Sequence, residues 1–128
     1  MVEAEANTAR RRAAEARGQD AESRVAEELA ARGWAILARR VRSPAGELDL
    51  VAERDGLLAF IEVKARPTLS EAAFALTPRQ RARLAAAAEA WLAANPGHGA
   101  LGMRFDVILV APSGMRRIAD AFRPGDPD

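Results

Sequence analysis

Apolar residues recur at helical spacing in the first part of the chain. Val25 and Leu29 lie four residues apart, and Ala21 lies on the same side of the predicted helix. The pattern predicts a helix over residues 13–32. Gly33 ends it, because glycine is typical of the position that follows a helix.

A second helix is predicted to begin beside Thr77. A threonine cap, Pro78 at the first helical position and Gln80 three residues after the cap form the pattern of a capping box. An apolar stripe follows, and residues 95–97 end the helix with turn-forming side chains. The stripe consists of Leu84, Ala88, Trp91 and Leu92.

Five apolar stretches separated by turn residues predict strands. They span residues 34–41, 47–53, 57–66, 103–111 and 115–122. Because the second helix lies between the third and fourth strands, these two should pair in parallel through a right-handed crossover. The order α-β-β-β-α-β-β therefore predicts an α/β fold, in which a mixed sheet is flanked by helices.

The chain has 128 residues, a net charge of +1 and no cysteine. This length suits one domain, which we expect at residues 13–123, between a flexible basic arm at 1–12 and a disordered tail at 124–128. The lack of cysteine excludes disulfides and zinc–thiolate sites. The longest apolar run, residues 56–61, is too short to span a bilayer, so we predict a cytoplasmic protein without a membrane partner.

Acidic side chains interrupt the second and third predicted strands. Because strand side chains alternate between faces, Leu48 and Leu50 should lie on one face of their strand and Asp49 on the other. Closing a hairpin at residues 55–56 then places Asp49 directly opposite Glu62. The two carboxylates should therefore lie about 5 Å apart between their Cβ atoms.

Like charges in such a position are destabilising, so something should offset their repulsion. Mg²⁺ is typically held by one or two carboxylates plus water and phosphate oxygens, and Asp49 and Glu62 fit this requirement. Lys64, on the same face as Glu62, could meet an anion at the metal. The alternative is an exposed sheet face that carries a Glu47–Lys64 ion pair and has no function.

Two helical residues bear on the same site. Glu22 lies three residues before Val25, which puts its carboxylate on the apolar side of the first helix, facing the sheet. Its alternative is an edge position that reaches water. Gln80 could hydrogen-bond a phosphate or a water at the site, or it could serve only as the partner of Thr77 in the capping box.

Four other residues are weaker candidates. Trp34 and Trp91 fit core positions better than stacking platforms for bases, and His98, the only histidine, is a poor metal ligand in its glycine-rich turn. Asp106 lies inside an apolar strand, where it is either a paired structural acid or a functional one.

Arginines are clustered along the chain although the net charge is small. Clustered arginines can neutralise phosphates even where distant acids cancel the total, and the alternative is a solvated surface. The clusters are Arg10, Arg11, Arg12 and Arg17, then Arg39, Arg40 and Arg42, then Arg79, Arg81 and Arg83.

Several of these segments together resemble the YraN-like family of bacterial proteins. That family is similar to archaeal Holliday-junction resolvases and belongs to the PD-(D/E)xK nuclease superfamily, which implies a restriction-endonuclease-like fold. The resemblance runs from about Arg17 to Phe122. It is carried by Gly18-x-x-Ala21-Glu22, Gly33-Trp34-x-Ile36-Leu37, Gly46-Glu47-Leu48-Asp49-Leu50-Val51, Phe60-Ile61-Glu62-Val63-Lys64-x-Arg66, Thr77-Pro78-Arg79 and Arg104-Phe105-Asp106-Val107.

By position, the resemblance implies that Asp49 and Glu62 are metal ligands and that Lys64 is the catalytic lysine. Glu22 would be the acidic residue that the first helix contributes. Gln80 stands where many relatives have lysine, which removes a charge from the site. The residues implied for nucleic-acid binding are Arg66, Gln80, Arg40, Arg42 and Arg79; of these, Arg40 stands where relatives often have asparagine.

The function that follows is Mg²⁺-dependent hydrolysis of phosphodiester bonds in structured or branched DNA, with Mn²⁺ as an alternative ion. Backbone contacts carry little sequence information, so selection by structure fits better than selection by sequence. Two alternatives stay open: a nucleic-acid-binding module of the same fold without turnover, and a structural or interaction protein. A homodimer would suit the two symmetric cuts in a four-way junction, although the sequence pattern shows no interface.

Overall fold

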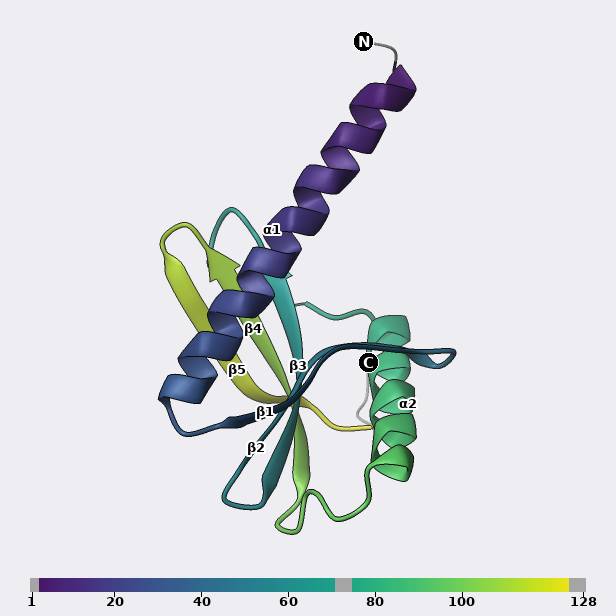
Figure 1. The fold of residues 1–128 in the computed structure, drawn as a ribbon, viewed down its shortest axis with the longest axis vertical. Helices are drawn as coiled ribbons and strands as arrows, with labels where there is room; N and C mark the ends of the chain where they lie inside the picture. Colours follow the sequence, from purple (N-terminus) through teal and green to yellow (C-terminus); the bar gives the residue numbers. More distant parts are fainter. Residues whose placement is uncertain (1–2, 71–74, 125–128) are drawn as a thin grey trace.

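The structure is a computed structural model that describes residues 3–70 and 75–124. Two helices and five strands follow one another in the predicted order (Figure 1). The elements are α1 (Glu3–Ala31), β1 (Ala35–Ser43), β2 (Gly46–Arg54), β3 (Leu57–Ala65), α2 (Pro78–Ala94), β4 (Met103–Ala111) and β5 (Gly114–Phe122). None of the helices in these ranges is long and apolar enough to cross a membrane.

The five strands form one mixed sheet in the order β1-β2-β3-β4-β5. β3 and β4 pair in parallel, as predicted, because the connection between them carries α2 and returns to the starting edge. The other three pairs are antiparallel. The prediction of a restriction-endonuclease-like α/β fold, with a mixed sheet flanked by helices, is confirmed.

Each helix covers one face of the sheet (Figure 1). On the α1 face, Val25 and Leu29 pack against side chains of the central strands such as Leu50 and Ile61. The α2 face has a second buried cluster, whose members are Leu48, Val51, Leu58, Phe60, Leu84, Ala87, Ala88, Trp91, Phe105 and Phe122. Burial on both faces encloses the central strands β2, β3 and β4, of which β4 is the most buried.

The predicted hairpin between β2 and β3 is confirmed. Arg54 pairs with Leu57 and Val51 with Phe60, as a two-residue turn at the predicted place requires. Both turn residues have positive φ, 51° at Asp55 and 81° at Gly56, which are the angles of a type I′ turn. This turn determines which residues of β2 and β3 can meet at the far end of the hairpin.

Helix α1 is longer than predicted. It begins at Glu3 rather than at residue 13, so most of the segment predicted as an arm continues the helix. Figure 1 shows this N-terminal part of α1 extending away from the sheet. The alanine-rich composition explains the extension, because alanine favours helix without needing a packing partner. Of the predicted tail, residues 125–128 lie outside the described residues.

Candidate functional site

The regular alternation of β2 breaks at Asp49. Leu50 packs in the cluster beneath α1, whereas Leu48 packs with Val51 in the cluster beneath α2. The prediction that Leu48 and Leu50 share a face is therefore wrong. The regular β2–β3 ladder also ends here, because its last pair joins Leu50 to Ile61.

The Asp49 carboxylate accounts for this break. Its Oδ2 accepts a hydrogen bond of 2.7 Å from the backbone amide of Val63 on β3. A side-chain oxygen thus takes a strand donor at the place where the ladder stops. The predicted direct pairings of Asp49 with Glu62 and of Glu47 with Lys64 are not ladder pairs, but the carboxyl groups of Asp49 and Glu62 still lie close enough for the charge of Asp49 to raise the pKa of Glu62.

Both carboxyl groups hold protons more tightly than usual. Burial raises the pKa of Asp49 to about 6, and the nearby charge of Glu22 adds to the effect, against the hydrogen bond from Val63. Burial also raises the pKa of Glu62 to about 8, with the Asp49 charge as the next cause. Two half-buried acids therefore repel each other near neutral pH unless a proton or a cation lies between them.

A hollow of about 180 Å³ opens beside the two acids. Its lining comes from β2, β3 and the first turns of α2, and consists of Glu47, Asp49, Glu62, Gln80, Arg83 and Leu84. The guanidinium of Arg83 is the only cationic side chain among these lining residues. The hollow therefore combines three carboxylates with one positive charge and one amide.

Gly46 lets α2 approach the sheet at this point. A Cβ at Gly46 would lie 3.0 Å from the carbonyl oxygen of Arg83, and the residue has a φ of +153°. Any side chain there would push against the backbone of α2. Gly46 thereby helps to hold Gln80 and Arg83 over the carboxylates.

Lys64 lies deeper than the sequence suggests. Only 8% of the residue is exposed, and its Nζ donates a hydrogen bond of 2.7 Å to the carbonyl oxygen of Ala75. Burial lowers the pKa of Lys64, and the Arg66 charge lowers it further, against the attraction of Glu62. Lys64 therefore interacts with Glu62 electrostatically but is not among the residues that line the hollow.

Glu22 reaches the neighbourhood of the acids from α1. Its charge acts on both Asp49 and Glu62, as the predicted orientation toward the sheet requires. The carboxylate is 14% exposed and pairs with Arg40, whose Nε lies 2.8 Å from its Oε2. Arg40 itself has a φ of +50°, uncommon for a residue other than glycine.

Gln80 has the structural role that the sequence left open and also lines the hollow. The capping box is complete, since the Thr77 hydroxyl accepts from the Gln80 amide and the Gln80 side chain accepts from the Thr77 amide. The side-chain oxygen of Gln80 is thus occupied, which leaves its NH₂ group for a ligand.

The other arginines predicted to bind nucleic acid are not brought together. Arg42 pairs with Glu47 across the β1–β2 hairpin, and Arg79 is exposed on α2. Arg66 follows β3 and donates a hydrogen bond to the carbonyl oxygen of Ala65. These three side chains therefore lie on different elements and do not line the hollow together.

Asp106 is a paired structural acid, one of the two readings that the sequence allows. It is 1% exposed, accepts from the Asp120 amide at 2.8 Å and lies 2.6 Å from Arg117. Trp34 lies in the core, as predicted, beneath the guanidinium groups of Arg54, Arg104 and Arg117. His98 pairs with Glu53, away from the hollow.

Comparisons with known proteins place the chain among its relatives. The uncharacterised protein family UPF0102 matches residues 21–110. A UPF0102 protein of Granulibacter bethesdensis is 61% identical over 107 residues, which cover 83% of this chain and 68% of the relative. A UPF0102 protein of Rhodopseudomonas palustris strain HaA2 is 58% identical over 95 residues, 74% of each chain. A third, from Bradyrhizobium sp. ORS 278, is 55% identical over 100 residues, 78% of this chain and 71% of the relative.

This chain belongs to the UPF0102 family. The YraN-like resemblance seen in the sequence is thereby confirmed. The matched segment of the UPF0102 protein contains Glu22, Asp49, Glu62, Lys64 and Gln80. The N-terminal arginines and the whole of β5 lie outside it.

The oxygen donors of this UPF0102 protein suit a hard cation that takes only one or two of its ligands from the protein. Within residues 3–70 and 75–124, no three His, Cys, Asp or Glu side chains are arranged to enclose a metal ion. Asp49 and Glu62 nevertheless place two carboxyl groups together beside an open hollow. Mg²⁺ is commonly bound by one or two carboxylates and completes its shell with water and substrate oxygens.

Arg83 lines the hollow, although the sequence pattern does not predict it as a site residue. In the sequence it belongs only to the cluster of Arg79, Arg81 and Arg83. A signal was present, because Arg83 lies three residues after Gln80 and shares its helix face. That spacing would have placed both side chains over the same carboxylates.

Proposed function

We propose that this protein is a Mg²⁺-dependent nuclease that hydrolyses phosphodiester bonds in structured or branched DNA. The observation that carries the proposal is the contact between the Asp49 and Glu62 carboxyl groups beside the hollow under α2. Burying two acids against each other is costly for a fold. A divalent cation bound between the two carboxylates would offset that cost.

Asp49 and Glu62 would hold the ion, and Val63 would orient the Asp49 carboxylate through its amide. Bound there, Mg²⁺ supplies Lewis-acid activation of a water and of the phosphodiester. Glu22 adds negative charge close to both ligands and strengthens the attraction for a cation. Its pairing with Arg40 keeps that carboxylate in place.

The cationic and amide groups around the hollow would bind the substrate. Lys64 uses one of its three donors on Ala75, so two donors remain for the oxygens of a phosphate on which charge develops. Arg83 and the NH₂ group of Gln80 face the hollow from α2 and would bind the phosphate from the other side. Such contacts recognise the backbone and leave base sequence unread, which suits selection by shape.

A second candidate is a nucleic-acid-binding module of the same fold without turnover. The observation in its favour is the position of Lys64, which is held by Ala75 and does not line the hollow. A lysine fixed in that position would contribute charge without reaching the reacting phosphate. In either case we expect DNA as the partner and the cytoplasm as the location, and a homodimer would suit two symmetric cuts in a four-way junction.

The decisive experiment incubates labelled four-way junctions, flaps and single strands with wild-type protein and Mg²⁺. The test variants are Asp49→Asn and Lys64→Gln, and the matched control is Glu89→Gln, an exposed position on α2. We expect cutting by wild type and the control, and a loss of about 100-fold or more in each test variant. Binding without cutting by wild type would favour the module, and no binding at low salt would favour an interaction protein.

A further inference from the structure

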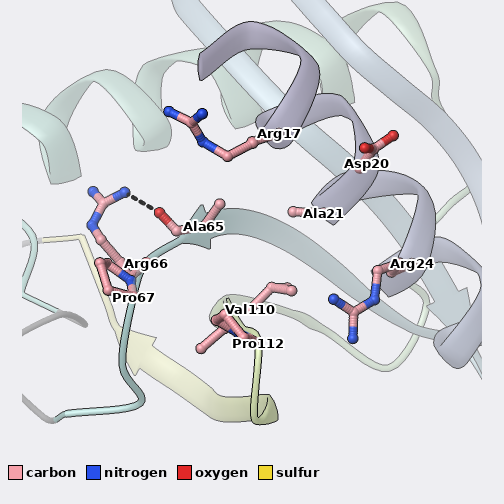
Figure 2. Close-up of a pocket in the computed structure, with 10 residues that line it drawn as sticks. Arg17, Asp20, Ala21, Arg24, Ala65, Arg66, Pro67, Val110 and Pro112 are labelled. Carbon is pink, nitrogen blue, oxygen red and sulfur yellow. Dashed lines mark hydrogen bonds between the residues drawn. The ribbon is translucent and has the colours of Figure 1, made fainter. Parts of the chain in front are cut away.

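A second hollow, of about 440 Å³, lies on the α1 face of the sheet, at the C-terminal ends of β3 and β4 (Figure 2). Arg17 and Arg24 border it from α1, and Arg66 borders it from the end of β3. Ala21 and Val110, both buried in the core cluster beneath α1, form part of its apolar floor. Three guanidinium groups thus surround a space large enough for a ligand.

The positive charge of this hollow is largely uncompensated. Asp20 is the single acid among its lining residues, and Figure 2 shows its carboxylate turned away from the guanidinium groups of Arg17 and Arg24. Within the described ranges, neither Arg17 nor Arg24 forms an ion pair or a hydrogen bond through its side chain. Arg66 donates only to the backbone carbonyl of Ala65.

The two helical arginines lie on the same side of α1. Arg17 and Arg24 are seven residues apart on α1. Seven residues make nearly two helical turns, so the side chains lie on one stripe, separated by about 10 Å along the axis. Two cations at this distance can contact different phosphates of one strand, because backbone charges recur along it at shorter intervals.

A neighbouring hollow shows the contrast. It has a volume of about 520 Å³, shares Arg24 and also contains Arg32 and Arg117. There, however, Arg32 pairs with Glu28, and Arg117 pairs with Asp106. Arg32 and Arg117 are therefore neutralised within the protein, whereas Arg17, Arg24 and Arg66 have no acidic partner among the described residues and are available to an external anion.

The hollow is also next to the proposed catalytic site along the chain. Arg66 comes two residues after Lys64 and four after Glu62. Ala65 packs toward α1, while the preceding acid and lysine face the opposite side of β3. A nucleic-acid strand that passes the end of β3 could therefore contact both sites.

We propose that Arg17, Arg24 and Arg66 form a phosphate-binding hollow for the nucleic-acid backbone, outside the scissile bond. The inference rests on the proposed function for its substrate class. Guanidinium groups are suited to this role because they bind phosphate oxygens bidentately and stay charged at every physiological pH. The hollow positions the strand, and the carboxylate site on the other face acts on it.

The test measures binding separately from cutting. Fluorescence anisotropy of a labelled single strand, without divalent ions and over a range of salt concentrations, compares wild type with the double variant Arg17→Gln/Arg24→Gln. The matched control is Arg11→Gln/Arg12→Gln, which removes the same charge from exposed positions on the same helix, outside the hollow. Circular dichroism confirms that each variant is folded.

We expect the double variant to bind at least about 10-fold more weakly at low salt. Its slope of log affinity against log salt should be smaller by about 1.4, since each phosphate contact on a single strand contributes about 0.7. The control should retain the wild-type slope. Equal slopes for wild type and the double variant would overturn the proposal that the hollow binds phosphate and would leave the nuclease proposal intact.

The remaining outcomes separate the two proposals. If the slope of the double variant differs from that of wild type but wild type never cuts DNA, the result would support phosphate binding by the hollow and overturn the catalytic function. Absence of wild-type binding to the single strand and to a four-way junction at low salt would overturn both.

Discussion

The carboxylate of Asp49, on β2, accepts a 2.7 Å hydrogen bond from the backbone amide of Val63, on β3. This contact lies where the ladder between the two strands ends, after the pair Leu50–Ile61. Asp49 therefore both links the two strands at the open end of the hairpin and places an acid beside Glu62. The candidate site is part of the strand pairing itself, so changes at Asp49 should affect stability as well as function.

The pH dependence of stability should reveal the repulsion between Asp49 and Glu62. The pKa of Glu62 is raised on folding, from 4.5 to about 8, so the folded state binds more protons than the unfolded chain. The corresponding stability is present below the unfolded pKa and is lost as the pH rises toward the folded pKa. Without metal, the melting temperature should therefore fall between about pH 4.5 and pH 8.

Glu62→Gln removes one of the two charges and should reduce that fall. We expect the variant to melt about 4 °C above wild type at pH 8 and close to it at pH 4, measured by calorimetry in a metal-free buffer. A lower melting temperature for Glu62→Gln at pH 8 would show that the acids do not repel each other in the fold.

Gly46→Ala should displace α2 from the sheet. The new Cβ would meet the Arg83 carbonyl oxygen at 3.0 Å, whereas a Cβ at Gly114 would meet nothing within 4 Å. Both glycines have similar backbone angles, with φ of +153° and +144°, so Gly114→Ala isolates the backbone strain. In urea unfolding, Gly46→Ala should lose about 2 kcal/mol more than the control. Equal losses would mean that α2 does not need this close approach.

Asp106→Ala should be strongly destabilising without touching the candidate site. The buried carboxylate holds the Asp120 amide and the guanidinium groups of Arg104 and Arg117. Its removal leaves two arginines without their acid, which typically costs about 3 kcal/mol. The same urea measurement on Glu89→Ala, at an exposed position, should change by less than about 0.5 kcal/mol. Similar values for the two variants would contradict the structural role of Asp106.

The parts of the fold that sequence predicted are those encoded locally. Thr77 and Gln80 are three residues apart and form the expected capping box. The turn at Asp55 and Gly56 sets the register of β2 against β3, because both residues tolerate positive φ. For the same reason the sequence predicts that Asp49 and Glu62 lie near each other, although their direct pairing in the ladder does not occur.

Features that depend on tertiary contacts could not be predicted in this way. The alternation rule assumes a regular strand, and it failed at Asp49 because the side chain takes the amide of Val63. Lys64 is bound by Ala75, which lies in a crossover whose path no local pattern specifies. Arg83 reaches the hollow only because Gly46 lets the helix pack closely.

If Asp49 and Glu62 together hold a divalent cation, isothermal titration with Mg²⁺ will detect a site that depends on both side chains. At pH 8, wild type should bind one ion per chain and release protons on binding, because the ion displaces protons that the raised pKa values retain. Asp49→Asn should weaken binding at least about 10-fold, and Glu89→Gln should bind like wild type. Equal Mg²⁺ affinity in wild type and Asp49→Asn, or no binding by wild type, would show that these two acids do not form a cation site.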